Sequence, residues 1–134
     1  GDNGSAIAAY QRAVSGNPRD AGSLSRLGHL YAVEKQGQDI ALALCGQAVE
    51  LDGGKADHWY RFALVQEMSQ DQEGAMQSLS ECLRLDPRQA EAALLLGRIF
   101  VQQSRPAKAR KLYKKVLRYS PEHARAQAAL AALS

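Results

Sequence analysis

The side chains best able to support chemistry in this sequence are two cysteines and three histidines. The sequence contains no Cys-x-x-Cys pair, and no histidine stands four residues from another histidine or a cysteine. Zinc sites use such closely spaced ligands, so the sequence predicts no metal site. Cys45 and Cys82 occur among apolar residues at helical spacing, which favours small, buried, inert side chains. A disulfide between them and a reactive thiol are the alternatives.

The remaining candidates for catalysis have simpler explanations. His58 and His123 each follow an acidic residue near an expected helix start, which predicts exposure to solvent. The sequence Asp-Gly-Gly-Lys at residues 52–55 looks like a phosphate-binding loop, but it lacks the Lys-Ser or Lys-Thr ending and no strand precedes it. It is predicted to be a turn that ends a helix. No Ser/His/Asp set and no pair of carboxylates occurs in a sequence context that marks it as catalytic. The sequence therefore predicts no enzyme and no cofactor.

The elements that carry these residues are expected to be helices. The 134 residues include 23 alanines and 17 leucines, which favour helices, but only six valines, three isoleucines and no threonine. Aromatic residues make up 6% of the chain, so the β-branched and aromatic residues typical of strands are scarce. No apolar run approaches the ~20 residues that span a bilayer. These proportions predict a single all-helical domain.

The positive charge of the chain is concentrated near its end. The net charge is +3, but residues 1–104 hold 9 Lys/Arg and 13 Asp/Glu, whereas residues 105–134 hold 8 and 1. The basic residues of the segment 105–118 alternate with an apolar stripe at helical spacing, which predicts a basic outer face on one helix. A solvated face is the simplest interpretation, and contact with an acidic partner is the alternative. The candidate contacts are Arg105, Lys108, Lys111, Lys115 and Arg118.

A period of 34 to 35 residues organises the whole chain. Three independent sets of positions keep this period, each with spacings of 35, 34 and 34. Such self-similarity is typical of repeat proteins. The first set is Leu27-Gly28, Phe62-Ala63, Leu96-Gly97 and Leu130-Ala131; the second is Ala6, Ala41, Ala75 and Ala109; the third is Pro18, Gly53, Pro87 and Pro121.

Each period reads as two helices joined by a turn. The small residues Gly28, Ala63, Gly97 and Ala131 are expected where the helices of a pair approach closely. The third set of positions follows apolar runs and is expected to end helices. The first period carries one extra residue, which is placed most economically in the turn at residues 35–39.

These residues resemble the tetratricopeptide repeat family, and the alanine-rich, degenerate repeats look similar to its bacterial members. The resemblance covers essentially the whole chain and implies an all-α, right-handed superhelical solenoid of about eight helices. Many bacterial members serve in envelope assembly, pili, secretion or polysaccharide export. The expected organisation within one domain is a half-repeat at 1–20, repeats at 21–55, 56–89 and 90–123, and a terminal half-repeat or capping helix at 124–134.

The resemblance also implies a function, because the first helices of such repeats line a concave groove that binds peptides. We expect a non-enzymatic scaffold or adaptor whose partner is a peptide segment with acidic and apolar residues. Arginine suits this role because its planar guanidinium binds carboxylates in bidentate geometry. The positions that correspond to the groove are Arg26, His29, Tyr60, Arg61, Leu64, Leu94 and Arg98.

Two other functions remain open from the sequence. One is an assembly module that self-associates through its repeat ends and uses the basic helix, since each end carries only half a repeat and suggests a piece of a longer array. The other is nucleic-acid binding through residues 105–118. The sequence names no partner or compartment; the cytoplasm is the default, and the bacterial periplasm follows if a signal segment has been removed.

Overall fold

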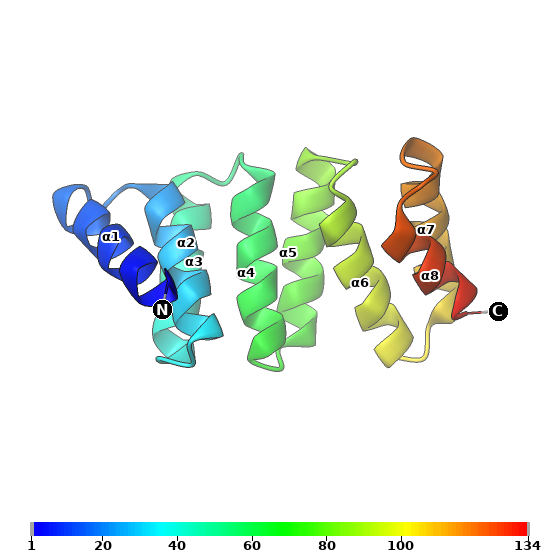
Figure 1. The fold of residues 1–134 in the computed structure, drawn as a ribbon, viewed down its shortest axis with the longest axis horizontal. Helices are drawn as coiled ribbons and strands as arrows, with labels where there is room; N and C mark the ends of the chain where they lie inside the picture. Colours follow the sequence, from blue (N-terminus) through cyan, green and yellow to red (C-terminus); the bar gives the residue numbers. More distant parts are fainter. Residues whose placement is uncertain (1, 134) are drawn as a thin grey trace. The chain divides into compact units, whose positions relative to one another are not determined.

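The computed structural model describes residues 2–133, and this range consists of eight helices and contains no strand (Figure 1). The all-α class predicted from composition is therefore confirmed. The helices are α1 (Asp2–Gly16), α2 (Ala21–Val33), α3 (Gln38–Leu51), α4 (Ala56–Met68), α5 (Gln72–Leu85), α6 (Ala90–Gln102), α7 (Pro106–Tyr119) and α8 (Ala124–Ala131). None of these helices is both long enough and apolar enough to cross a membrane.

Short turns join the two helices of each pair. The turn between α2 and α3 spans four residues, 34–37, whereas the corresponding turns at 69–71 and 103–105 span three. The extra residue of the first period therefore lies in this turn, as the sequence predicts. One residue in each turn adopts the left-handed region, with φ between 56° and 66°, and so reverses the chain after the first helix. These residues are Lys35, Gln70 and Ser104.

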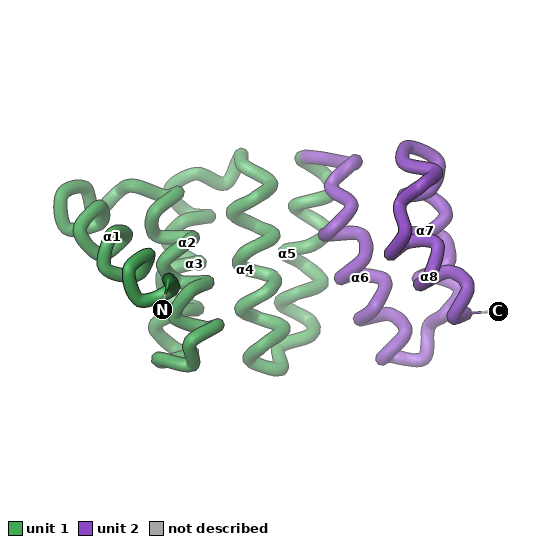
Figure 2. Tube along the Cα trace, viewed as in Figure 1, with its two compact units in different colours: residues 1–85 green, residues 86–134 purple. Residues whose placement is uncertain are grey.

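The backbone groups into two compact units (Figure 2). The N-terminal unit, up to residue 85, holds α1 to α5, and the C-terminal unit, from residue 86, holds α6 to α8. In the N-terminal unit, α2 packs against α1, α3 and α4, and α4 also packs against α3 and α5. In the C-terminal unit, α7 packs against both α6 and α8. The first helices of two successive repeats, α2 and α4, therefore lie side by side.

Close approach of α2 to α3 depends on the absence of a side chain at Gly28. A Cβ atom on Gly28 would lie 2.7 Å from Cys45 Sγ and 2.9 Å from the backbone oxygen of Ala41. Both neighbours are fully buried, in a core cluster that includes Val65 from α4. The predicted role of the small residue is confirmed here.

At the equivalent positions of the other repeats, the predicted close helix contact is present at Ala63 and Gly97 but not at Ala131. Ala63 is fully buried, and a Cβ on Gly97 would lie 2.8 Å from Tyr113 Oη and closer still to the tyrosine ring. Ala131 is exposed, so the expectation of a close helix contact is wrong there. The physical reason is that α8 packs against the preceding α7, and Ala131, at its end, faces away from this contact.

Candidate partner-binding site

The face formed by α2 and α4 carries five of the seven residues predicted to bind a partner. We call this surface, made of Arg26, His29, Tyr60, Arg61 and Leu64, the α2–α4 face. Arg26 is exposed, and the other four side chains are half-buried. Arg26 and Arg61 occupy the same position of successive repeats, 35 residues apart, so the packing of α2 beside α4 brings the two arginines together.

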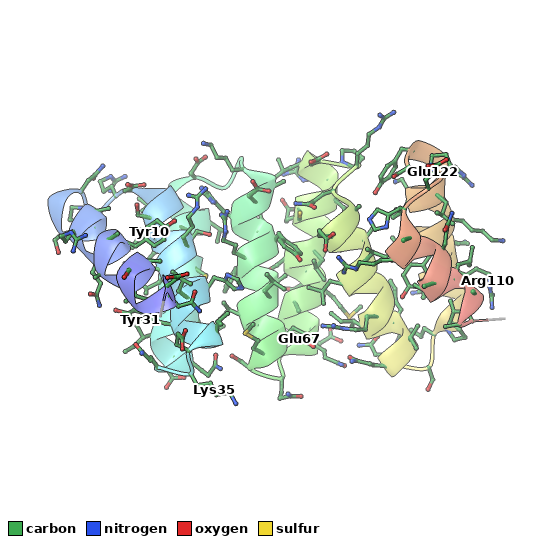
Figure 3. The ribbon with its side chains drawn as sticks, viewed as in Figure 1. Tyr10, Tyr31, Lys35, Glu67, Arg110 and Glu122 are labelled. Carbon is green, nitrogen blue, oxygen red and sulfur yellow. The ribbon has the colours of Figure 1, made fainter. Side chains whose placement is uncertain are left out.

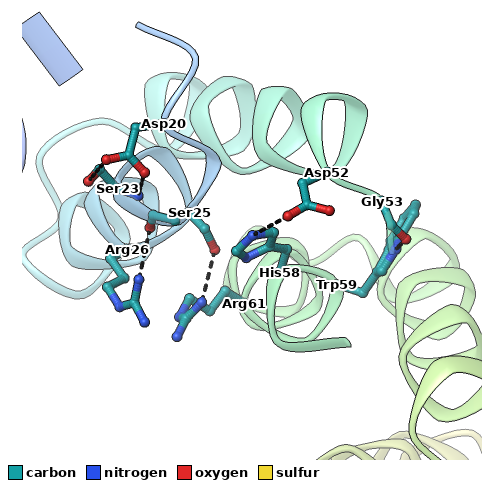
Figure 4. Close-up of polar contacts among 10 residues, drawn as sticks. Asp20, Ser23, Ser25, Arg26, Asp52, Gly53, His58, Trp59 and Arg61 are labelled. Carbon is teal, nitrogen blue, oxygen red and sulfur yellow. Dashed lines mark hydrogen bonds and ion pairs between the residues drawn. The ribbon is translucent and has the colours of Figure 1, made fainter. Parts of the chain in front are cut away.

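The two guanidinium groups point to the same side of their helices, and their partners are neutral oxygens (Figure 4). Nη1 of Arg61 donates to Oγ of Ser25 over 3.4 Å, and Nη1 of Arg26 donates to the backbone oxygen of Gly22 over 3.4 Å. Burial lowers the pKa of Arg61 from its ordinary value, and the charge of Arg26 lowers it further. A guanidinium has five N–H donors, so both side chains keep capacity for an anionic partner.

His58 is buried, with only 5% of its surface exposed, so the expectation of solvent exposure is wrong. Its Nε2 lies 3.9 Å from Oδ2 of Asp52, and its Nδ1 has no hydrogen-bond partner. Burial lowers the pKa of His58 and Arg61 lowers it further, whereas Asp52 acts in the opposite direction. The equivalent positions in the neighbouring repeats, Ser23 and Ala92, are also buried, so the packing of the repeat buries this position whichever residue occupies it.

The charge of Arg61 also acts on His29, which lies on the neighbouring helix α2. Burial is the main cause that lowers the pKa of His29, and the Arg61 charge is the second. Both imidazoles are therefore favoured in the neutral form, because burial disfavours the charged ring and protonation would place another cation beside Arg61.

A cleft of about 510 Å³ adjoins the α2–α4 face in the N-terminal unit. The link between α1 and α2 forms one wall, and the link between α3 and α4 forms another. Residues 52–55 end α3, as the sequence predicts, but Asp52 and Lys55 also line this cleft. The turn is held in place by Trp59, whose Nε1 donates to the backbone oxygen of Gly53 over 2.9 Å. Sequence reasoning missed Lys55 as a site residue because it treated the turn only as a helix end.

The remaining predicted residues lie in the C-terminal unit. Leu94 and Arg98 are on α6, where Leu94 is buried, with 7% of its surface exposed, and Arg98 is exposed. On α7, Lys108 Nζ lies 5.5 Å from the centroid of the Phe100 ring, and Arg110 donates to the backbone oxygen of Leu133 (Figure 3). The predicted basic patch is exposed throughout: Arg105, Lys108, Lys111, Lys115 and Arg118.

Neither cysteine forms a disulfide, and both are fully buried, as the sequence predicts. Sγ of Cys45 donates to the backbone oxygen of Ser25 over 3.6 Å, and burial raises the pKa of this thiol to about 12. A thiol in this state is a packing residue, because the nucleophilic form of cysteine is the thiolate. Among residues 2–133, no group of three or more His, Cys, Asp or Glu side chains is placed to hold a metal ion.

Comparisons with known proteins agree with this repeat architecture. The family model described as "Tetratricopeptide repeat" matches residues 67–133, which is half of the chain. No curated protein matches the sequence. A crystal structure of MamA superposes with a TM-score of 0.85 at 24% identity, over 99% of this chain and 77% of that chain.

Other solved structures extend the similarity. TTC0263, described as a thermophilic TPR protein in Thermus thermophilus, gives a TM-score of 0.83 at 20% identity, over 95% of this chain and 70% of that chain. The Arabidopsis OM64 TPR domain gives 0.75 at 19% identity, over 84% of this chain and 93% of that chain. At these identities the structures show the fold alone. Together with the matched family model, the helix pairs and their 34-residue period establish that the chain belongs to the tetratricopeptide repeat family.

Proposed function

We propose that this protein is a non-enzymatic scaffold whose α2–α4 face binds a segment of a partner protein. The tetratricopeptide fold is a protein-interaction scaffold and is generally non-catalytic. The partner segment that this face would accept carries both acidic and apolar residues. Arg26 and Arg61 supply charged donors, and the half-buried Tyr60 and Leu64 supply apolar contact area.

One observation carries the proposal: two neighbouring arginines, the exposed Arg26 and the half-buried Arg61, donate long hydrogen bonds to neutral oxygens. A partly buried charge is stabilised by an opposite charge, and a carboxylate on a partner would supply it. His29 adds a neutral imidazole beside Arg61 on the same face. In the C-terminal unit, Leu94 and Arg98 hold the repeat positions of Tyr60 and Leu64, and Arg98 is exposed.

The test is a binding measurement on a peptide selected against the intact chain. Peptides from a random display library are first selected on the wild type, and affinity is then measured by fluorescence polarisation for wild type, Arg61→Glu and Tyr60→Ala. We expect at least a tenfold loss for Arg61→Glu, because a charge-assisted bond becomes a repulsion. Lys35→Glu is the matched control, since Lys35 is exposed in the turn between α2 and α3, at the other ends of these helices from the cleft (Figure 3).

Circular dichroism must show that the variants remain folded. Equal affinity of Arg61→Glu and the wild type, or an equal loss in Lys35→Glu, would contradict the α2–α4 face as the binding surface.

A second candidate contact is the basic face of α7. The five basic patch residues are exposed, and the helix contains no acidic residue. Late cations on α7 also complement its dipole, which accounts for Arg118 without a partner. The double variant Lys111→Glu/Lys115→Glu separates the alternatives. Loss of self-association by light scattering would support an assembly module, and loss of salt-sensitive binding to a nucleic-acid oligomer would support nucleic-acid binding.

A further inference from the structure

Four cations of helix α7 form one continuous outer face. They are spaced at i, i+3, i+4 and i+7, which places their side chains on the same side of a helix. All four are exposed, whereas the residues on the opposite side of α7, Ala109, Tyr113 and Val116, are buried. We call these four side chains the α7 quartet: Lys111, Lys114, Lys115 and Arg118.

The protein does not neutralise the α7 quartet. No ion pair joins any of its four side chains to another residue that the structure describes. Helix α7 contains no acidic residue, and the next one along the chain, Glu122, lies beyond the end of the helix (Figure 3). Like charges four residues apart repel on a helix, so the two such pairs within the quartet destabilise α7. The helix dipole favours a cation in the last turn only, which explains Arg118 but none of the three lysines.

The second helices of the other repeats show that the fold does not require cations at these positions. On α5, the equivalent face has no net charge, because its one acidic and one basic side chain, Glu81 and Arg84, form an ion pair of 2.9 Å. On α3, it carries a single negative charge, from Glu50. The equivalent residues are Gln77, Ser80, Glu81 and Arg84 on α5, and Ala43, Gly46, Gln47 and Glu50 on α3. The packing of the repeat therefore does not account for the four positive charges on α7.

The composition of the quartet favours a charged surface over a folded partner. Three of its four cations are lysines, which act as point charges, whereas arginine is the residue that suits bidentate recognition of a carboxylate. Helix α7 exposes no aromatic or large apolar side chain that could anchor a protein partner, since its two leucines, Leu112 and Leu117, are half-buried. The same feature disfavours single-stranded nucleic acid, whose bases stack on exposed aromatic rings. A planar anionic surface needs only cations that lie on one side of the helix.

We propose that α7 binds the surface of an anionic lipid membrane through the α7 quartet, with the helix axis parallel to the membrane plane. Clusters of four or more Lys and Arg residues on an amphipathic helix are typical of such binding, and each cation near the surface raises the affinity roughly fivefold. Because the apolar side of α7 is buried within its own unit, the attraction is electrostatic and involves no insertion into the lipid. The quartet lies outside the α2–α4 face, so this proposal is independent of the proposed function.

The test is binding of the full chain to lipid vesicles, measured by co-sedimentation at low ionic strength. One vesicle preparation is pure phosphatidylcholine, and the other contains about one third phosphatidylserine. We expect the wild type to bind only the anionic vesicles and to be released by added salt. The variant Lys111→Gln/Lys114→Ser/Lys115→Glu gives α7 the corresponding residues of α5. It should bind the anionic vesicles about a hundredfold more weakly, because three cations are removed.

A matched control separates the position of the cations from the net charge of the chain. Arg12→Gln/Arg19→Ser/Lys55→Glu makes the same three kinds of change at exposed positions of the N-terminal unit, and it alters the net charge equally. It should bind the anionic vesicles as the wild type does. Circular dichroism checks that both variants are folded. If the α7 variant does not fold, Lys114→Ser alone, at an exposed position, should still weaken vesicle binding about fivefold.

The outcomes distinguish the membrane from other anionic partners. A loss of vesicle binding that is confined to the α7 variants would support the proposal, whatever peptide affinity Arg61→Glu retains. Binding of the wild type to neither vesicle, equal binding to both, or an equal loss in the control variant would overturn it. Tighter binding to a DNA duplex or to polyglutamate, at the same concentration of anionic groups, would also overturn it and would assign the quartet to a nucleic acid or to an acidic protein.

Discussion

Nη1 of Arg61 on α4 lies 3.4 Å from Oγ of Ser25 on α2, and Ser25 is fully buried. A hydroxyl in the interface between two first helices thus orients the arginine that we place at the centre of the binding face. Ser25 holds the repeat position equivalent to that of Tyr60, so the smaller side chain in the first repeat leaves room for this contact.

Ser25→Ala should lower the free energy of unfolding by about 1 kcal/mol, because one partly buried hydrogen bond is lost and Arg61 loses its acceptor. Urea unfolding followed by the fluorescence of Trp59, the single tryptophan, gives this value. Ser80→Ala, at an exposed position of α5, should change the free energy by less than about 0.5 kcal/mol. If the two variants are equally stable, the Arg61–Ser25 contact does not stabilise the fold.

Gly28→Ala should destabilise the N-terminal unit by about 1–3 kcal/mol. The added Cβ would lie too close to Cys45 Sγ and to a backbone oxygen that cannot move independently of α3. Gly46→Ala is the matched control, because a Cβ there would meet only the Phe62 ring, at 3.8 Å. Alanine at this interior position of α3 should raise stability by roughly 0.5–1 kcal/mol, since glycine disfavours helix interiors. Both values follow from urea unfolding.

Arg61 should control the titration of two histidines on different helices. Arg61→Met should raise the pKa of both His29 and His58, because the arginine charge opposes protonation of each imidazole. Asp52→Asn should lower the pKa of His58 further, because it removes the one charge that favours the protonated ring. NMR titration of the imidazole signals measures both effects. A shift of His58 alone in Arg61→Met would show that His29 lies outside the arginine's field.

The repeat register could be read from the sequence because the fold imposes it locally. A glycine such as Gly28 is needed wherever two helices of a pair touch, and one extra residue can only be inserted in a turn, so both signals lie within a single repeat. The exposed basic face of α7 was predictable for the same reason, since helical spacing alone separates its cations from its apolar stripe.

The cleft could not be read in this way, because it depends on contacts between repeats. His58 follows an acidic residue in a first turn, which indicates exposure, but the packing of α4 against α2 and α3 buries it. Lys55 and Arg19 belong to links that are 35 residues apart in the chain, and only the tertiary structure places them around one cavity. Charge and spacing along the chain do not indicate which links lie close together in the folded protein.

Stability should be greatest between about pH 6.5 and 9, with separate causes at the two limits. The pKa values of His29 and His58 are lowered in the folded state from 6.5, so the unfolded chain binds protons first as the pH falls. Their contribution is complete above pH 6.5 and is lost as the pH falls through the folded-state values. The pKa of Cys45 is raised from 9.0 to about 12, so its contribution is complete below pH 9 and is lost above it.

Variants should flatten each limit of this profile independently. Urea unfolding at a series of pH values should show a shallower acid limb for His29→Gln/His58→Gln and a shallower alkaline limb for Cys45→Ala. Either variant will also change the absolute stability, since His58 and Cys45 are buried, so the slope with pH is the quantity that tests the assignment. An acid limb of unchanged slope in the histidine variant would mean that other groups, such as Asp20 and Glu81 with their lowered carboxylate pKa values, control acid unfolding. Because those carboxylates act below pH 4.5, the position of the limb on the pH axis distinguishes the two causes.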